Sequence, residues 1–196
     1  MAVLDLREPV RRVALWMCLG ALLAPSVRAA DDEKETPRGA HAASECREAP
    51  RCPLFDEVYA HTPAFRHALS LSLRHGDEAV PEWVKDRLPG HGPPPDQPRP
   101  PTTATPMLPL RIDDRPYLLG HMSDPQNPRH RLVALYDTQR GLAAVDYVNA
   151  DAKAARLGDD AEILRKVIDD YLRPESDFAR SLARPDVALP VPVRSH

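Results

Sequence analysis

The sequence lacks the short motifs that mark common enzyme active sites. It has no G-x-S-x-G nucleophile turn, no glycine-rich phosphate loop, no H-E-x-x-H zinc motif and no dinucleotide-binding glycine pattern. The paired carboxylates Asp159-Asp160 and Asp169-Asp170 are sequence neighbours, whose side chains point about 100° apart on a helix and so form no acid/base pair. We interpret these carboxylates as solvent-exposed groups at helix caps and on helix faces. We therefore expect a non-enzymatic protein without a cofactor or bound metal.

Beyond its N-terminus the chain also lacks a long apolar run. The basic residues Arg7, Arg11 and Arg12 precede an apolar segment, 13–27, which is short for a bilayer span and is followed by small residues. This pattern predicts a signal peptide over residues 1–30, cleaved after Ala29 or Ala30, and export to the periplasm. A retained N-terminal anchor is the alternative; after cleavage we expect no membrane association.

An excess of positive charge is absent as well. The formal net charge is −3, and removal of residues 1–30 takes away four basic and two acidic residues, which leaves −5. A mildly acidic exported chain is poorly suited to nucleic acid or anionic membrane. It suits a basic protein partner.

The chain has 3 cysteines, and Cys18 lies inside the predicted signal. The remaining two, Cys46 and Cys52, are separated by five residues, and a close pair in an oxidising compartment predicts a disulfide. A redox pair or half of a metal site are the alternatives. Redox motifs usually have two intervening residues, and no second cysteine pair completes a zinc site.

Composition divides the remainder of the chain. Polar residues 31–45 predict a disordered segment, 46–174 a folded domain, and 175–196 a flexible C-terminal tail. A proline-rich linker, 90–109, interrupts the domain, because six of the nine residues in 93–101 are proline. This linker is a spacer or, alternatively, a ligand for a proline-binding domain.

Periodicity predicts the elements of the domain. Residues 52–61 alternate like a short strand, and 62–76 read as a helix with Thr62 as its N-cap. Short apolar segments separated by turn residues then predict an antiparallel meander. Its strands are 107–112, 117–122, 130–137 and 142–148, with turns at Asp113-Asp114 and Gly141; 152–157 is a last strand or an approach to a helix.

A helix over 160–172 follows, capped by Asp159 or Asp160. Its apolar stripe should pack on the sheet and consists of Ile163, Leu164, Val167, Ile168 and Leu172. The predicted fold class is therefore α+β, with a central antiparallel sheet and helices packed against it.

One hairpin tip is unusual. The polar segment Ser123, Asp124, Pro125, Gln126, Asn127, Pro128 joins two apolar strands, and Arg129 and His130 complete the connection. A loop stiffened by prolines loses little entropy when it enters a cleft, which favours a binding loop; a tight connection that prevents edge aggregation is the alternative. His121 and His130 flank the tip and offer a further alternative, a metal site.

Several motifs in order resemble the Ivy family, inhibitors of vertebrate lysozyme. They are the export signal, a helix with Phe65 and Leu69, "VPEWV", "TP", "L-x-I-D-x-x-x-Y", the polar hairpin loop, "RLVALYD" and "GL", over about 65–172. The resemblance implies an antiparallel sheet with packed helices. Members of the family are often dimeric, so the resemblance also allows a homodimer. The family's inhibitory loop is Cys-Lys-Pro-His-Asp-Cys, closed by a disulfide, and its histidine bonds the two catalytic carboxyls of lysozyme.

The resemblance places this loop on residues 123–128, counted from Tyr117. Pro125 matches, whereas Ser123 and Pro128 stand at the cysteine positions, Asp124 at the lysine, Gln126 at the histidine and Asn127 at the aspartate. Pro125 and Pro128 can partly replace the disulfide by fixing φ. Gln126 makes hydrogen bonds without charge, Asp124 would be repelled by cleft carboxylates, and a shifted register would present Arg129, His130 or Arg131.

The sequence thus predicts a periplasmic binder or inhibitor of lysozyme, or of another peptidoglycan-cleaving enzyme, that acts through residues 123–130. The alternative is a divergent Ivy-like envelope-binding protein without lysozyme inhibition.

Overall fold

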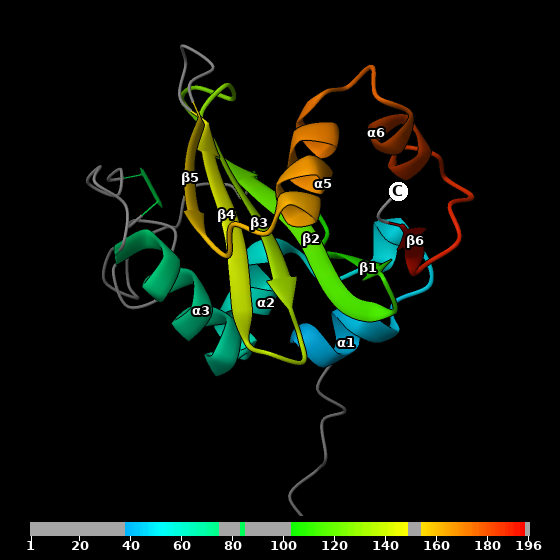
Figure 1. The fold of residues 1–196 in the computed structure, drawn as a ribbon, viewed down its shortest axis with the longest axis horizontal. Helices are drawn as coiled ribbons and strands as arrows, with labels where there is room; N and C mark the ends of the chain where they lie inside the picture. Colours follow the sequence, from blue (N-terminus) through cyan, green and yellow to red (C-terminus); the bar gives the residue numbers. More distant parts are fainter. Residues whose placement is uncertain (1–37, 75–82, 85–102, 149–153, 195–196) are drawn as a thin grey trace, which may run out of the picture. The chain divides into compact units, whose positions relative to one another are not determined.

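The computed structural model describes residues 38–74, 83–84, 103–148 and 154–194 (Figure 1). The predicted signal peptide, residues 31–37 and most of the proline-rich segment lie outside these ranges. Within them, no helix combines the length and apolar character that a membrane crossing requires.

A six-stranded sheet forms the centre of the described fold. Its strands are β1 (Leu108–Ile112), β2 (Arg115–Ser123), β3 (Arg131–Asp137), β4 (Leu142–Val148), β5 (Ala154–Gly158) and β6 (Val191–Val193). They lie in the order β5-β4-β3-β2-β1-β6, and each pair is antiparallel except β1 with β6. The predicted α+β class and the antiparallel meander are confirmed, and the uncertain segment 152–157 contributes a strand.

Helices cover both faces of this sheet (Figure 1). On one face, α1 (Ala40–Glu45), α2 (Phe55–His61) and α3 (Pro63–Arg74) supply residues to a cluster with Leu118, Leu132 and Tyr136. On the other, α5 (Glu162–Leu172) and α6 (Asp177–Leu182) pack with Leu119, Val133 and Leu135. Neighbouring strand residues enter different clusters because side chains alternate between the two faces.

The turns follow the sequence prediction. Asp113 and Asp114 have φ of 44° and 68°, and Gly141 has φ of 66°. Positive φ at two consecutive residues suits the tight turn between β1 and β2, because that geometry matches the twist of paired strands. Aspartate tolerates this region better than most residues with a side chain.

The predicted helix over 160–172 is also confirmed, and its apolar stripe faces the sheet. Leu164, Val167 and Ile168 are buried, with Ile163 and Leu172 partly buried beside them. The helix starts at Glu162 with Ala161 as its N-cap, so neither Asp159 nor Asp160 is the capping residue.

One local prediction was wrong. Residues 55–61 form helix α2 rather than a strand, because Phe55, Val58 and Tyr59 recur at the three- and four-residue spacing of a helix face, and all three are buried. Thr62 does occupy the position before α3, which begins at Pro63, and its carbonyl accepts from the Arg66 amide at 3.1 Å. Its hydroxyl is used elsewhere, since it accepts a hydrogen bond of 2.8 Å from the Ala40 amide of α1.

The predicted disorder at both ends was also wrong in part. Residues 40–45 form α1, which buries Ala43 completely. The tail contains α6 and β6, and β6 pairs with the edge of β1. The last residues of the predicted linker belong to the fold too, since Met107 is fully buried and Leu108-Pro109 start β1. Each segment is ordered by contacts with residues distant in the sequence.

The predicted disulfide is confirmed: Cys46 and Cys52 are bonded. The bond closes a small loop that contains the short helix η1 (Ala49–Arg51). Cys52 packs with the cluster under α5 and α6, so the cross-link holds this loop against that side of the sheet.

A buried ion pair ties α5 to the sheet. Arg165 Nη1 lies 2.7 Å from Asp146 Oδ1 on β4, and their side chains are 7% and 0% exposed. Arg165 also donates to the carbonyl groups of Val145 and Leu157. Burial raises the pKa of Asp146, and the guanidinium groups of Arg165 and Arg156 oppose this change.

We expect Arg165→Met to lower the free energy of unfolding by about 3–5 kcal/mol, because it leaves the buried Asp146 carboxylate with only the half-exposed Arg156 guanidinium, 4.0 Å from its Oδ2. Urea unfolding of the purified variant measures the change. The double variant Asp146→Leu, Arg165→Met removes both charges and should recover most of the loss. A double variant as unstable as Arg165→Met would contradict this account.

Candidate functional site

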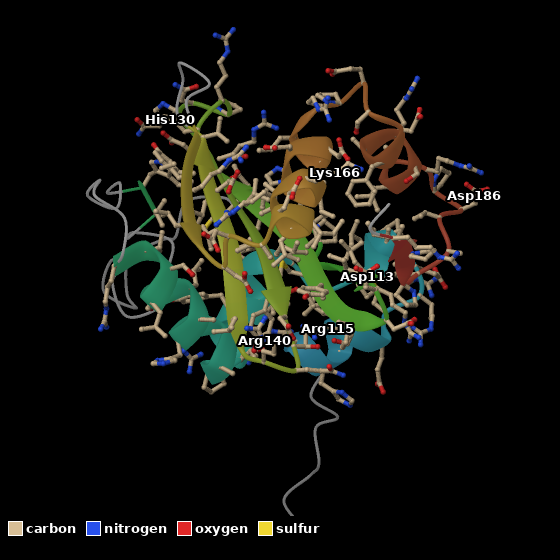
Figure 2. All side chains as sticks on the ribbon, viewed as in Figure 1. Asp113, Arg115, His130, Arg140, Lys166 and Asp186 are labelled. Carbon is tan, nitrogen blue, oxygen red and sulfur yellow. A yellow bond between two sulfur atoms is a disulfide. The ribbon has the colours of Figure 1, made fainter. Side chains whose placement is uncertain are left out.

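The connection between β2 and β3 lies at one end of the sheet. Ser123 and Arg131 are the last paired residues of the two strands, and residues 124–130 form the loop beyond them. Figure 2 shows His130 at this end and Arg115 and Arg140 at the other. The loop predicted as the binding element is therefore presented by two long, buried strands.

Short-range hydrogen bonds hold this loop. The Asp124 amide donates to the His130 carbonyl at 3.0 Å, and the His130 amide donates to the Asn127 carbonyl at 2.8 Å. The Asp124 side chain accepts from the Gln126 amide at 2.9 Å, and the Asn127 side chain accepts from the Arg129 amide at 3.2 Å. These are two Asx turns in succession, a geometry that Asp and Asn favour.

His130 belongs to the same network. Its Nδ1 lies 3.5 Å from Asp124 Oδ2, and its Nε2 lies 3.4 Å from Asn127 Nδ2. The ring also packs edge-on near Tyr147, with centroids 6.5 Å apart. His130 therefore supports the loop from inside and does not project from it, unlike the cleft-entering histidine that the family resemblance describes.

The exposed residues of the loop are Pro125, Gln126, Pro128 and Arg129, while Ser123 is buried. Asp124 is turned inward, with its side chain only 14% exposed. The surface that a partner would meet therefore consists of two prolines, one amide and one guanidinium. Among the three basic candidates for a shifted register, Arg129 is the exposed one.

The metal alternative built on His121 and His130 does not fit the geometry. His121 lies in β2 opposite Val133, and its ring contacts Tyr171 of α5. The His130 ring packs near Tyr147, which belongs to the cluster on the opposite face of the sheet. In the described ranges no group of three or more His, Cys, Asp or Glu side chains is arranged to hold a metal ion.

Close to the loop, the sequence interpretation missed a second polar group. His121 Nδ1 lies 2.8 Å from Tyr171 Oη, and the His121 amide donates to the Thr105 hydroxyl at 2.9 Å. Burial, together with the nearby Arg131 guanidinium, lowers the pKa of His121 to about 4. His121 stands between apolar residues of β2, which hinted at burial, but its partner is 50 residues away in the sequence.

No family model, no curated protein and no solved structure matches this chain.

Because the Asp124 side chain accepts the Gln126 amide that closes the first Asx turn, we expect Asp124→Ala to loosen the loop. The order parameter of the Gln126 amide, measured by ¹⁵N relaxation, should fall from a rigid value near 0.85 to below about 0.6. Asp56→Ala, at a partly buried position of α2, should leave it unchanged. An unaltered Gln126 amide in Asp124→Ala would show that the loop is held without the Asp124 side chain, by its prolines and its remaining hydrogen bonds.

Stability should depend on His121 between about pH 6.5 and pH 4. The folded protein keeps His121 neutral, with a pKa of about 4, while the unfolded chain binds a proton near pH 6.5. Between these two pH values, unfolding takes up a proton. The contribution of neutral His121 to the free energy of unfolding is therefore complete above about pH 6.5, and it falls by at most roughly 3 kcal/mol as the pH drops to about 4.

Urea unfolding at pH 7 and pH 4.5 measures this dependence. His121→Gln should remove that part of the pH dependence, whereas His67→Gln, at an exposed position of α3, should retain it. Equal pH dependence of the wild-type protein and His121→Gln would contradict the assignment.

Proposed function

We propose that this chain is an exported, Ivy-type protein that binds a lysozyme-like muramidase through residues 123–130 and blocks its cleft. The observation that carries the proposal is the hairpin tip itself. At the position where the Ivy resemblance places the inhibitory loop, the chain presents exposed Gln126 and Arg129 on a framework closed by its own side chains.

The chemistry of the target supports Arg129 as the principal contact. Glycoside hydrolases of the lysozyme type carry two carboxyl groups that flank the scissile bond. A guanidinium can form charge-assisted hydrogen bonds with such groups, which are roughly twice as strong as neutral ones. Arg129 supplies the positive charge that Gln126 lacks, and Gln126 adds neutral hydrogen bonds.

The orientation of Asp124 removes the main objection to this proposal. A carboxylate in place of a lysine would repel the cleft carboxylates if it projected from the loop. Instead, Asp124 accepts the Gln126 amide and faces His130. Its charge is directed into the loop, away from the exposed surface.

Preorganisation also favours binding. Hydrogen bonds within 124–130 and the fixed φ of Pro125 and Pro128 reduce the conformational freedom that a partner would have to remove. The acidic net charge of the chain, −3 before removal of any signal, would speed encounter with a basic lysozyme at low salt.

We expect the purified protein, freed of residues 1–30, to inhibit a c-type lysozyme in a cell-wall turbidity assay at low salt. Arg129→Gln should raise the inhibition constant by about tenfold or more, because it removes a charge-assisted contact. The matched control is Arg140→Gln, which removes the same charge from the β3–β4 turn at the other end of the sheet (Figure 2).

Full lysozyme activity at a large molar excess of the protein would overturn the inhibitor proposal. Equal inhibition by wild type and Arg129→Gln would show that Arg129 is not the contact. The alternative, an Ivy-like envelope-binding protein, is tested by pull-down from periplasmic extract with the Gln126→Ala, Asn127→Ala variant. Loss of a partner in that variant would support this alternative.

A further inference from the structure

A cavity of about 600 Å³ opens on the α5–α6 side of the sheet, near the loop end of β2 and β3. This volume is typical of sites for small organic ligands. Much of its lining is apolar, including Pro50, Pro106, Leu108 and Leu182. The polar groups that line it come from the segment before β1, from β2, β3 and α5, and from α6 with the residues after it.

Three of these polar side chains already have partners. His121 and Tyr171 bond one another at 2.8 Å, and the Thr105 hydroxyl donates to the His121 carbonyl at 3.2 Å. These contacts fix the cavity wall in place. His121 is neutral at physiological pH because of its burial, so it adds no charge to the wall.

Arg131 differs from His121, Tyr171 and Thr105 because its side chain has no hydrogen-bond partner among the described residues. Its Nε is buried without a hydrogen-bond partner, and its guanidinium forms no hydrogen bond or ion pair with any residue that the structure describes. A buried donor without a partner costs about 1–3 kcal/mol, and more when the group is charged. A ligand that accepts from this guanidinium would remove that cost.

The charge around the cavity is of one sign. Arg180 and Arg184 also line it, and each is paired locally, with Asp177 and Asp186 respectively. No acidic side chain appears among the described lining residues. The positive charge of Arg131 is therefore unbalanced within the cavity, and the complementary ligand group is an anion.

We propose that this cavity binds a small organic acid whose carboxylate is held by Arg131 and whose apolar body lies against the proline- and leucine-lined wall. This inference does not rest on the muramidase proposal. His121 and Arg131 face α5 and α6, whereas Gln126 and Arg129 are exposed on the loop. The hairpin would thus carry two separate sites.

The test uses the purified protein without residues 1–30 and two probes of equal size, 2-naphthylacetate and 2-naphthylacetamide. Titration calorimetry at pH 7, with NMR detection of the Tyr171 and His121 ring signals, measures binding. We expect the carboxylate to bind at least about tenfold more tightly than the amide, because only the carboxylate forms charge-assisted bonds with Arg131.

Two variants locate the site. Arg131→Gln should weaken carboxylate binding by about tenfold or more and bring it close to amide binding. Arg111→Gln removes the same charge from an exposed position of β1 and should leave the affinity within about twofold of wild type. Circular dichroism and thermal unfolding verify that both variants are folded.

Equal affinity of the two probes for the wild-type protein would overturn the proposal, and so would the absence of carboxylate binding at millimolar concentration. Because this comparison needs no variant, it holds even if Arg131→Gln does not fold. Equal weakening by Arg131→Gln and Arg111→Gln would likewise contradict the assignment. Lysozyme inhibition is measured separately, so either proposal can fail alone.

Discussion

The burial of β3 on both faces is the constraint on which the rest of the structure depends. Every residue over 132–137 is buried, so the strand cannot leave one side open to water. Helices α1, α2 and α3 cover one side, and α5 with α6 covers the other. This explains why the C-terminal segment is ordered: Leu182 of α6 and Val191 of β6 pack in the same cluster as Leu110, which would lose that cover without them.

The same constraint determines where polar chemistry can lie. Along β2 and β3 most side chains are apolar on both faces, and the polar groups His121, Ser123 and Arg131 lie toward the loop end of the two strands. There the alternation separates them: His121 faces the cavity under α5 and α6, while His130 turns toward Tyr147 on the opposite side. One hairpin can therefore present a loop and a cavity wall that do not share side chains.

Much of the fold was predictable, since strand and helix periods are local signals. The meander, α3 and the stripe of α5 follow from such periods, and the turn at Asp113-Asp114 from its residue types. Helix α2 was not predicted, because its short sequence fits strand alternation as well as the helical spacing of Phe55, Val58 and Tyr59. Strand β6 could not be predicted, because three residues carry little pattern and its partner β1 is about eighty residues earlier.

The candidate loop shows the same division between local and distant information. Its position and its prolines could be predicted from the sequence. The Asx turns of Asp124 and Asn127 were predictable too, because each depends only on a residue two positions ahead. The inward orientation of His130 could not be predicted, because it depends on Tyr147 in a different strand. This arrangement gives the loop a closure that needs no thiol chemistry. The single described disulfide, Cys46–Cys52, lies in another part of the fold, so the geometry of the loop does not depend on a cysteine pair of its own.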